Sequence, residues 1–312
     1  MKRLLIIFAL AGFALACTGC KNNVEETASQ QPQSSGFAVS LLSVVNHHEE
    51  PDVDKEIGCQ SLMGTVLSVL DYLNGWYKVE TPEGYVAWVS SEAIVLKDSD
   101  QLAEWNDSPK LIVTAISDVL YSEPYLGSDI ICDITLGDVL VKGEKNGEFC
   151  TCFLPNGKTA YVQQKNVMDL DAYNESIITT GDSVVAIAMQ FLGFPYVWGW
   201  NCAKGMDCSG FTQFVYHLHG LALPRNSSAQ ARTGEEISIE DNLELLLPGD
   251  LVFFCNTTPG RVNHVGIYIG NGEFIHCGTS CVKINSLYKD AVNLYPKADN
   301  LYCARRIITA EW

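Results

Sequence analysis

The sequence is poor in basic residues. Lysine and arginine number 20 against 37 aspartate and glutamate residues, and the formal net charge is −17. An acidic chain repels the phosphates of DNA and RNA, so we expect no nucleic-acid partner. The 312 residues are 47% hydrophobic, which is enough for two or three compact domains.

Zinc-binding cysteine spacing is also missing. The chain has twelve cysteines but no pair of Cys-x-x-Cys motifs, so we expect no metal site, and nothing implies an organic cofactor. Most of the cysteines lie scattered in strand-like runs and are expected to be small buried residues, although export would permit disulfides.

The only long apolar run stands at the N-terminus and is short for a bilayer span. It extends from Leu4 to Ala16 after a basic pair, and small residues precede Cys17 and Cys20. Residues 1–19 resemble a bacterial lipoprotein signal peptide. We therefore expect export to the bacterial cell envelope (periplasm or cell surface) and a membrane anchor on lipid-modified Cys17 or Cys20. A plain signal peptide is the alternative.

Residues 20–36 are polar and lack hydrophobic periodicity, as expected of a flexible tether. Two similar segments follow, "GTVLSVLDYLNGWYKVETPEGYVAWV" and "GDVLVKGEKNGEFCTCFLPNGKTAYV". Short strands separated by Asn-Gly and Pro-x-Gly turns are typical of small antiparallel β-barrels. The pair resembles tandem bacterial SH3-like domains, which we place at residues 37–98 and 108–172.

The pattern changes at residue 176. Apolar spacing predicts a helix over Gly181–Gly193 and another over Asp207–Gly220. Strand-like runs then cover Asp250–Cys255, His264–Gly270 and Glu273–Cys277. Helices followed by antiparallel strands predict an α+β domain over residues 176–312.

Cys208 is the candidate nucleophile. It lies at the predicted start of the second helix, where the positive end of the backbone dipole lowers a thiol pKa. Cys202 lies in the preceding loop and lacks that advantage. We expect Cys202 to pack or to pair with another thiol.

A cysteine nucleophile needs a base, which is usually a histidine. We expect His47 and His48 to face solvent, and His217 and His219 lie too far along the Cys208 helix to reach the thiol. His264 and His276 remain, on strands joined by "GNG". A three-residue loop places both on one face, where His276 could orient His264, whereas a two-residue turn places them on opposite faces.

Several motifs occur in a characteristic order: "YVWGW", "MDCSGF", "LPRNSSAQ", "LLPGDLVFF" and "NHVGIYIGNGEFIH". This ordered set resembles the NlpC/P60 cysteine peptidases. The resemblance implies a papain-like α+β catalytic domain preceded by the two SH3-like β-barrels. It also implies a Cys–His–His triad of Cys208, His264 and His276, with Tyr196 assisting at the oxyanion.

The same resemblance implies a substrate. Members of the family mostly cut peptidoglycan stem peptides between γ-linked D-Glu and a diamino acid, and a subgroup with two SH3-like domains acts on peptides with a free N-terminal L-Ala. The matching substrate contacts are Asp207, Ser209, Trp198, Asn226, Ser227, Glu56 and Tyr85. The family often has aspartate at the position of Asn226, and a neutral amide cannot neutralise an ammonium.

The leading hypothesis is thus an envelope-anchored γ-D-glutamyl–diamino acid endopeptidase of muropeptide recycling, whose partners are peptidoglycan-derived peptides and the membrane. An endopeptidase acting on intact cell wall is one alternative. A non-catalytic wall-binding lipoprotein and an amidase that cuts the sugar–peptide link are two others.

Overall fold

The structure is a computed structural model that describes residues 36–239, 243–255 and 261–309. The predicted signal peptide, the tether before Gly36 and both candidate lipidation cysteines lie outside these residues. Among the described residues, no helix is long and apolar enough to cross a membrane.

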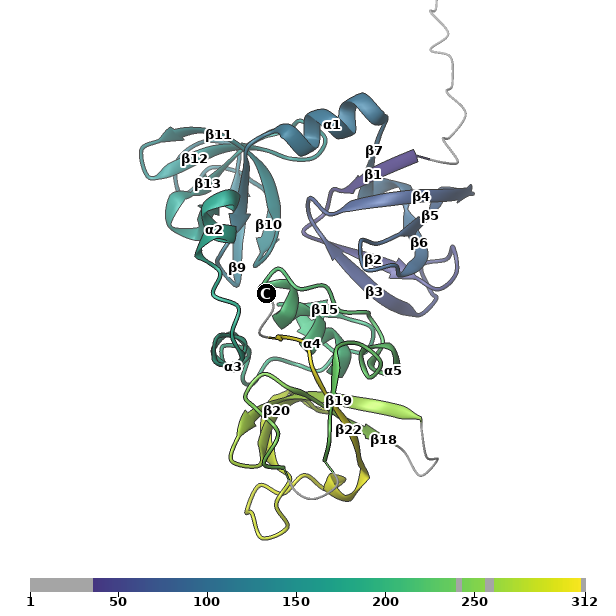
Figure 1. Ribbon diagram of the computed structural model, residues 1–312. Helices are drawn as coiled ribbons and strands as arrows, with labels where there is room; N and C mark the ends of the chain where they lie inside the picture. Colours follow the sequence, from purple (N-terminus) through teal and green to yellow (C-terminus); the bar gives the residue numbers. More distant parts are fainter. Residues whose placement is uncertain (1–35, 240–242, 256–260, 310–312) are drawn as a thin grey trace, which may run out of the picture. The chain divides into compact units, whose positions relative to one another are not determined.

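The first domain is a seven-stranded antiparallel sheet with the order β3-β2-β6-β5-β4-β1-β7 (Figure 1). Its core is built from alternate residues of the strands, among them Leu67, Val69 and Val79, as the period of two requires. The strands are β1 (Gly36–Ser40), β2 (Val44–His48), β3 (Ile57–Leu62), β4 (Val66–Leu73), β5 (Trp76–Glu80), β6 (Val86–Ser90) and β7 (Ile94–Lys97), with the 3₁₀ turn η1 (Ser91–Ala93) before β7.

The second domain repeats this arrangement. Its order is β10-β9-β13-β12-β11-β8-β14, which is the first order with each strand number raised by seven. The elements are β8 (Lys110–Val113), β9 (Ser117–Tyr121), β10 (Ile130–Thr135), β11 (Val139–Asn146), β12 (Phe149–Phe153), β13 (Thr159–Gln163), η2 (Gln164–Asn166) and β14 (Val167–Asp169). Helix α1 (Ser99–Asp107) joins the two sheets, and α2 (Leu170–Ser176) leads out of the second.

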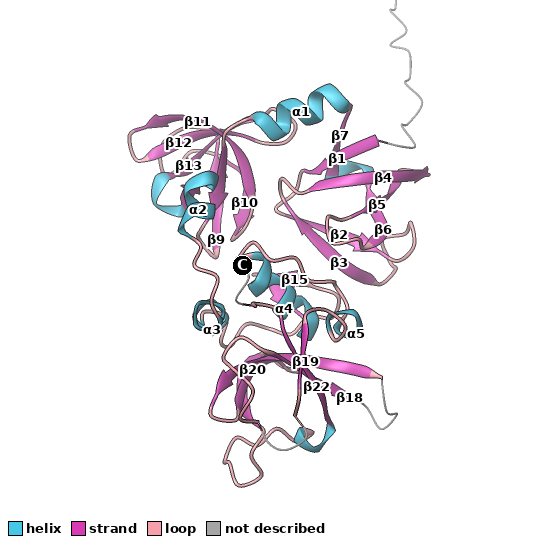
Figure 2. Cartoon of the chain, viewed as in Figure 1, coloured by secondary structure: helices cyan, strands magenta, loops and turns pink. Residues whose placement is uncertain are grey.

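The third domain has a six-stranded antiparallel sheet with the order β17-β22-β18-β19-β20-β21, and it holds the longer C-terminal helices (Figure 2). Its strands are β17 (Glu235–Ile237), β18 (Leu251–Cys255), β19 (Val262–Gly270), β20 (Glu273–Cys277), β21 (Val282–Ser286) and β22 (Leu301–Arg306). The remaining elements are α3 (Gly181–Met189), the short hairpin β15 (Asn201–Cys202) and β16 (Gly205–Met206), α4 (Cys208–His217), α5 (Ser227–Gln230) and η3 (Ala298–Asn300).

Helices α3 and α4 form where the sequence predicts them. Thr180 caps α3 in a capping box with Ser183, and Asp207 caps α4 by accepting a hydrogen bond from the backbone of Gly210. Helix α4 lies against β19 and β20, and its residues 208–216 are all buried. The predicted end of α3 at Gly193 was wrong, because the helix ends at Met189, and Leu192 lies beyond it and is 44% exposed.

The prediction that His47 and His48 face solvent was also wrong. Both are buried in the first sheet, where His47 Nε2 lies 2.8 Å from the hydroxyl of Ser61. His48 Nδ1 lies 2.9 Å from the carbonyl oxygen of Lys55, and its ring meets Trp76 edge to face. Acidic neighbours in the sequence suggested exposure, but a bulge between His47 and His48 interrupts the alternation of β2, and both side chains are buried.

Candidate active site

Cys208 is the first residue of α4 and is 7% exposed. A backbone hydrogen bond from Val265, the residue after His264, favours the thiolate form of Cys208. The sulfur of Cys208 therefore lies beside β19. The thiol therefore lies at a helix N-terminus and next to the strand of the predicted base. Cys202 is buried in the apolar core, and all ten cysteines of the described residues are free.

The pKa of the Cys208 thiol differs from the sequence-based expectation. Burial, and secondly the charge of Asp207, raise this pKa to about 12, although the backbone N–H groups of Ser209 and Val265 oppose the shift. The helix dipole therefore does not populate the thiolate in the resting site. A base must take the proton when the sulfur attacks.

His264 and His276 provide the base and its partner. They lie on β19 and β20, and His264 Nε2 is 2.7 Å from His276 Nδ1. Burial is the main cause that lowers the pKa of His264 to about 3 and that of His276 to about 4. Both rings are therefore neutral at neutral pH, and His264 can accept a proton.

The turn that brings the two histidines together differs from the predicted one. Gly270 pairs with Glu273 across a two-residue turn, in which Asn271 and Gly272 have φ values of 54° and 75°. Such a turn was expected to separate the histidines. A bulge at Ile269 adds one residue to β19, so that Tyr268 pairs with Phe274 and the strands regain the register of a three-residue loop.

A chain of polar groups extends beyond His276. His276 Nε2 is 2.9 Å from Asn285 Oδ1, and Asn285 Nδ2 donates to the backbone carbonyl of Asn293 at 2.7 Å. Aromatic rings enclose the pair: Tyr295 stacks on His264 with centroids 5.7 Å apart, and Phe274 stacks on His276 at 4.7 Å. Sequence reasoning missed Asn285 and Tyr295, because neither belongs to a recognised motif.

Asp207 was predicted as a substrate contact, but the fold already uses both of its carboxylate oxygens. Arg225 binds them in a buried bidentate ion pair, and the backbone N–H groups of Gly199 and Gly210 also donate to them. Since Asp207 is 4% exposed, its position favours holding the loop before α4 over binding substrate. Ser209 is also buried, with its hydroxyl 3.0 Å from Arg225 Nη1.

Tyr196 lies in the loop before the nucleophile and pairs with Met206 in an isolated bridge. Burial, and secondly the charge of Cys208, raise the pKa of its phenol, which therefore stays protonated as a donor. Asn226 and Ser227 lie at the start of α5, and Asn226 is exposed there.

Residues of the first sheet reach the same loop. Trp198, which is 64% exposed, donates its indole N–H to the carboxylate of Glu56. The hydroxyl of Tyr85 donates to Glu49, a residue that sequence reasoning missed. The structure thus pairs Glu56 with Trp198, and it pairs Tyr85 with another carboxylate, that of Glu49.

Two further contacts join β3 to this loop. Gln60 and Asn201 exchange backbone and side-chain hydrogen bonds, including one of 2.7 Å from Gln60 N to Asn201 Oδ1. Gly199 has φ +78°, and a Cβ there would lie 1.7 Å from the carbonyl oxygen of Ile57. Only glycine permits this approach.

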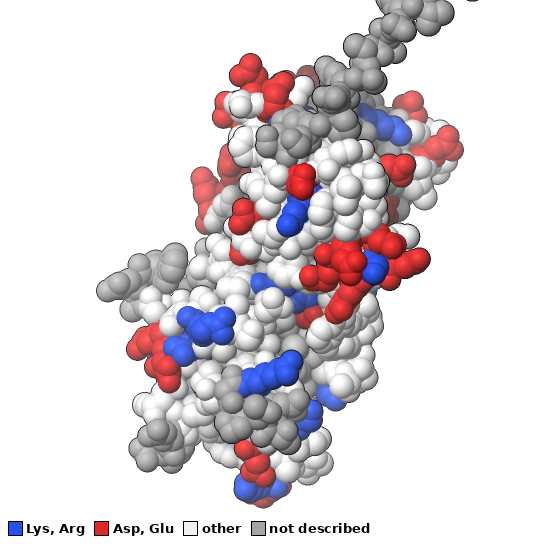
Figure 3. Space-filling model, turned by 90° about the vertical axis from the view of Figure 1, so that its right-hand side faces the viewer, with Lys and Arg blue, Asp and Glu red and all other residues white. Residues whose placement is uncertain are grey.

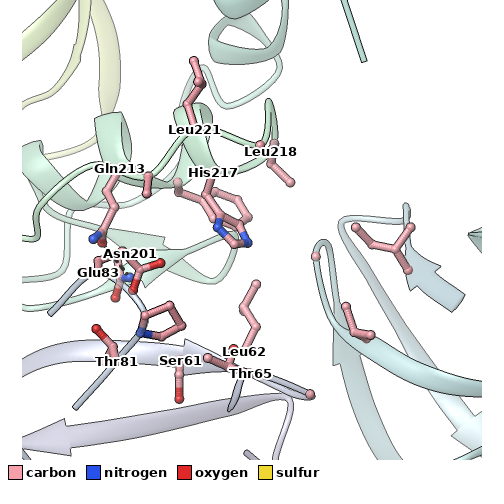
Figure 4. Close-up of a pocket in the computed structure, with 18 of the residues that line it drawn as sticks. Ser61, Leu62, Thr65, Thr81, Glu83, Asn201, Gln213, His217, Leu218 and Leu221 are labelled. Carbon is pink, nitrogen blue, oxygen red and sulfur yellow. Dashed lines mark hydrogen bonds between the residues drawn. The ribbon is translucent and has the colours of Figure 1, made fainter. Parts of the chain in front are cut away.

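A cavity of about 520 Å³ lies elsewhere, at the other end of α4 (Figure 4). Its lining includes Leu62, Glu83, His217 and Leu221, but not Cys208, His264 or His276. Burial lowers the pKa of His217, so Glu83 supplies the charge there, and no cysteine is among the described residues that line the cavity. The face drawn in Figure 3 shows more acidic than basic side chains, in keeping with the overall charge.

The chain is similar to known proteins over its first and third domains. Residues 193–296 match the NlpC/P60 family, and residues 43–95 match the bacterial SH3 domain. These ranges include Tyr196, Cys208, His264 and His276 in the first case, and Glu56 and Tyr85 in the second.

Two curated relatives have informative names. The chain is 30% identical over 226 residues to the gamma-D-glutamyl-L-lysine dipeptidyl-peptidase of Bacillus cereus, which covers 70% of this chain and 66% of that protein. It is 25% identical over 266 residues to dipeptidyl-peptidase 6 of Lysinibacillus sphaericus, covering 80% and 91%. The chain thus spans just under two thirds of the length of the first relative.

A solved structure shows the same fold. The crystal structure of an NlpC/P60 family protein from Bacillus cereus superposes with a TM-score of 0.74 at 23% identity, over 88% of this chain and all of that one. The predicted fold class, an NlpC/P60 α+β domain after SH3-like β-rich domains, is confirmed.

Proposed function

The chain belongs to the NlpC/P60 family, and from that premise we propose that it is a cysteine peptidase that cleaves the γ-D-glutamyl–diamino acid bond of peptidoglycan stem peptides. The observation that supports this most is Cys208 at the head of α4, beside β19, with the His264–His276 pair on the adjoining strands. The name of the Bacillus cereus relative, gamma-D-glutamyl-L-lysine dipeptidyl-peptidase, supplies the bond.

The reaction is acyl transfer through a thioester. As the Cys208 sulfur attacks the γ-glutamyl carbonyl carbon, its proton passes to His264. His264 Nε2 is occupied by His276, so Nδ1 receives the proton. The imidazolium then protonates the leaving amine as the C–N bond breaks. Water next attacks the thioester and gives a proton to His264, which returns it to the departing sulfur.

Two groups stabilise the oxyanion of each tetrahedral intermediate in this proposal. The Tyr196 phenol remains protonated and can donate, and backbone N–H groups at the start of α4 point out of the helix end. Trp198, Ser209, Asn226 and Ser227 line the acyl side of the substrate.

The preferred substrate is a soluble muropeptide with a free N-terminal L-Ala, as expected of a recycling enzyme. Glu56 binds the ammonium, and the pair of Tyr85 and Glu49 closes the same end of the cleft. Glu49 adds negative charge on the side where Asn226 supplies none. This gate excludes intact cell wall, in which the alanine amine is acylated.

The test is mass spectrometry of L-Ala-γ-D-Glu-meso-diaminopimelate, of its N-acetylated form and of intact sacculi, each incubated with the protein. Release of L-Ala-D-Glu from the free peptide alone is the expected result, and Cys208→Ala is the inactive control. Equal cleavage of the blocked peptide or of sacculi would discard the gate and indicate a wall hydrolase. If the wild type cleaves nothing, the non-catalytic wall-binding function replaces the peptidase.

We also propose that the protein is an exported lipoprotein of the bacterial envelope, anchored through Cys17 or Cys20. The basic pair, the apolar run and the small residues before each cysteine support it. Membrane fractionation of Cys17→Ser and Cys20→Ser, with intact masses, identifies the lipidated residue as the one whose loss releases the chain. A wild-type chain without a lipid mass would refute the anchor.

A further inference from the structure

We propose that Asn285 is a positioning residue that sets the tautomers of both histidines, so that His264 presents an unprotonated Nδ1 to the Cys208 thiol. This inference rests on the proposed function for its catalytic meaning, but the tautomers themselves can be observed without any substrate. Asn285 lies on β21, opposite Phe274 and diagonal to His276 on the same face.

The backbone carbonyl of Asn293 can only accept hydrogen bonds. It accepts one from Asn285 Nδ2 at 2.7 Å and one from the backbone N–H of Ser286 at 3.0 Å. The amide nitrogen of Asn285 must therefore face this carbonyl, because the opposite orientation would set two acceptor oxygens against each other. The amide orientation of Asn285 is thus fixed from outside the site.

The orientation of the Asn285 amide determines which nitrogen of His276, and then which nitrogen of His264, carries a proton. Asn285 Oδ1 can only accept, so His276 Nε2, at 2.9 Å, carries a proton. A neutral His276 then has a lone pair on Nδ1 and accepts from His264 Nε2 at 2.7 Å. A neutral His264 with its proton on Nε2 leaves Nδ1 as the acceptor, which is the state that a general base for a thiol requires.

The surroundings keep both rings neutral, which this chain of donors and acceptors needs. The rings are buried among Phe254, Phe274 and Tyr295. Lys283 lies on β21 and pairs with His276 across the sheet. Its charge disfavours protonation of both rings, and the charge of Lys297 disfavours protonation of His264. A carboxylate at position 285 would have favoured an imidazolium, whereas the amide selects a tautomer without adding charge.

The direct test is ¹⁵N NMR of the full chain labelled at histidine, at pH 7, with signals assigned by their loss in His264→Gln and His276→Gln. We expect a proton on Nε2 and none on Nδ1 of both residues. A proton on Nδ1 of either ring would overturn the proposal. This result does not depend on which peptide the protein cleaves.

The second test compares two exchanges at the same position. Asn285→Leu removes the acceptor and should lower kcat about 10–100-fold with KM within about twofold, because the productive tautomer is no longer selected. Alkylation of Cys208 by iodoacetamide, followed by peptide mapping, should slow as well. Asn285→Asp keeps the acceptor for His276 but loses the hydrogen bond to the Asn293 carbonyl, so kcat should fall less than in Asn285→Leu.

The pH dependence of kcat distinguishes a positioning role of Asn285 from a role in packing alone. The carboxylate of Asn285→Asp raises the pKa of the histidine pair, so the acidic limb of kcat should move to higher pH. Asn300→Leu, the same exchange at a half-buried asparagine of η3, is the matched control and should leave the profile unchanged. Equal losses in Asn285→Leu and Asn285→Asp without a shifted limb, or wild-type kinetics in Asn285→Leu, would refute the role of Asn285.

If the wild type cleaves none of the peptides, the proposed function fails, and the NMR and alkylation measurements still decide the tautomer proposal. If Asn285→Leu does not fold, the wild-type spectrum and Asn285→Asp are sufficient.

Discussion

The two N-terminal sheets have one backbone plan but different surfaces. Glu49 N donates to Glu56 O at 3.0 Å in the first sheet, and Ser122 N donates to Asp129 O at 2.8 Å at the equivalent place in the second. The bulge next to each hairpin also matches, since His47 pairs with Cys59 and Leu120 with Cys132. The shared backbone fold alone therefore does not make a substrate gate.

The side chains make the difference. Gly58 in the first sheet leaves room for the Tyr85 hydroxyl and the Glu49 carboxylate, which a Cβ would approach to 2.1 and 2.2 Å. Ile131 occupies the corresponding position of the second sheet. Contact with the catalytic domain differs too: the first sheet meets Gly199 and Asn201, whereas Asp133 of the second forms an ion pair with Lys204, between β15 and β16.

The largest effect is expected from Gly199→Ala, which attacks the contact that distinguishes the first sheet. A Cβ at φ +78° and 1.7 Å from the Ile57 carbonyl oxygen forces the two backbones apart. We expect kcat/KM to fall at least about 100-fold, since the loop also holds Asp207.

Gly157→Ala is the matched control for that exchange. Gly157 has φ +81° in the second sheet, and nothing lies within 4 Å of a Cβ there. It should cost about 1–2 kcal/mol of stability and leave kcat/KM almost unchanged. Similar kinetic losses in both variants would show that backbone strain, rather than docking of the first sheet, controls activity.

Glu56→Gln tests the gate itself. The amide oxygen can still accept from Trp198, but the charge that pairs with the substrate ammonium is gone, which is worth about 1.5–3 kcal/mol. We expect kcat/KM for the free peptide to fall about 10–100-fold. Asp129→Asn, the equivalent exchange in the second sheet, should have no effect, and comparable losses from both would remove the functional distinction between the sheets.

His47→Leu replaces a buried histidine with the residue that the second sheet has, because Leu120 is equally buried. Burial, and secondly the charge of His48, lower the pKa of His47 from 6.5 to about 3. The unfolded chain therefore binds a proton that the folded chain refuses, and stability is lost as the pH falls below 6.5 toward 3. This group alone contributes about 2 kcal/mol of loss between pH 7 and pH 5.

Urea unfolding of wild type and His47→Leu at both pH values measures this contribution. The variant should lose about 2 kcal/mol less between pH 7 and pH 5, although the lost hydrogen bond to Ser61 costs it about 1 kcal/mol throughout. An identical pH dependence of the two proteins would mean that His47 has the same pKa in the folded and the unfolded chain.

The smallest effect should come from Asp133→Ala, which removes the ion pair between Lys204 and the second sheet and leaves the hydrogen bond from Lys204 to Ser43 in the first domain. Both side chains are partly exposed, at 32% and 58%, so the pair is worth about 1 kcal/mol at most. We expect kcat/KM within about twofold of wild type and a melting temperature lowered by about 2 °C or less. A large kinetic loss would give the second sheet a part in the site.

Most of the sheets and helices could be predicted from the sequence. The duplicated turn signals indicated two sheets, and the caps and apolar spacing of α3 and α4 placed Cys208 at a helix start. These signals are local, because turns and caps depend on residues a few positions apart. The order of the motifs identified the family and predicted a triad of Cys208, His264 and His276.

Contacts between distant segments could not be predicted. The bulge at Ile269 has no signal in "GNG", and the burial of His47 depends on strands that close over it. Glu49 meets Tyr85 across 36 residues, and Asn285 meets His276 only because β21 pairs with β20. The pKa of Cys208 was predicted in the wrong direction because its burial by the rest of the fold outweighs the local helix dipole.

With the bulge at Ile269, the two histidine rings share one side of the sheet only because the number of residues between them has the right parity. Inserting or deleting one residue in this hairpin would turn one ring to the other side of the sheet, while a change of two would keep both on one side. A turn that is longer by one residue can be accommodated only if the bulge disappears at the same time. Length variation between His264 and His276 is therefore permitted in compensated steps, and the turn and the bulge must change together.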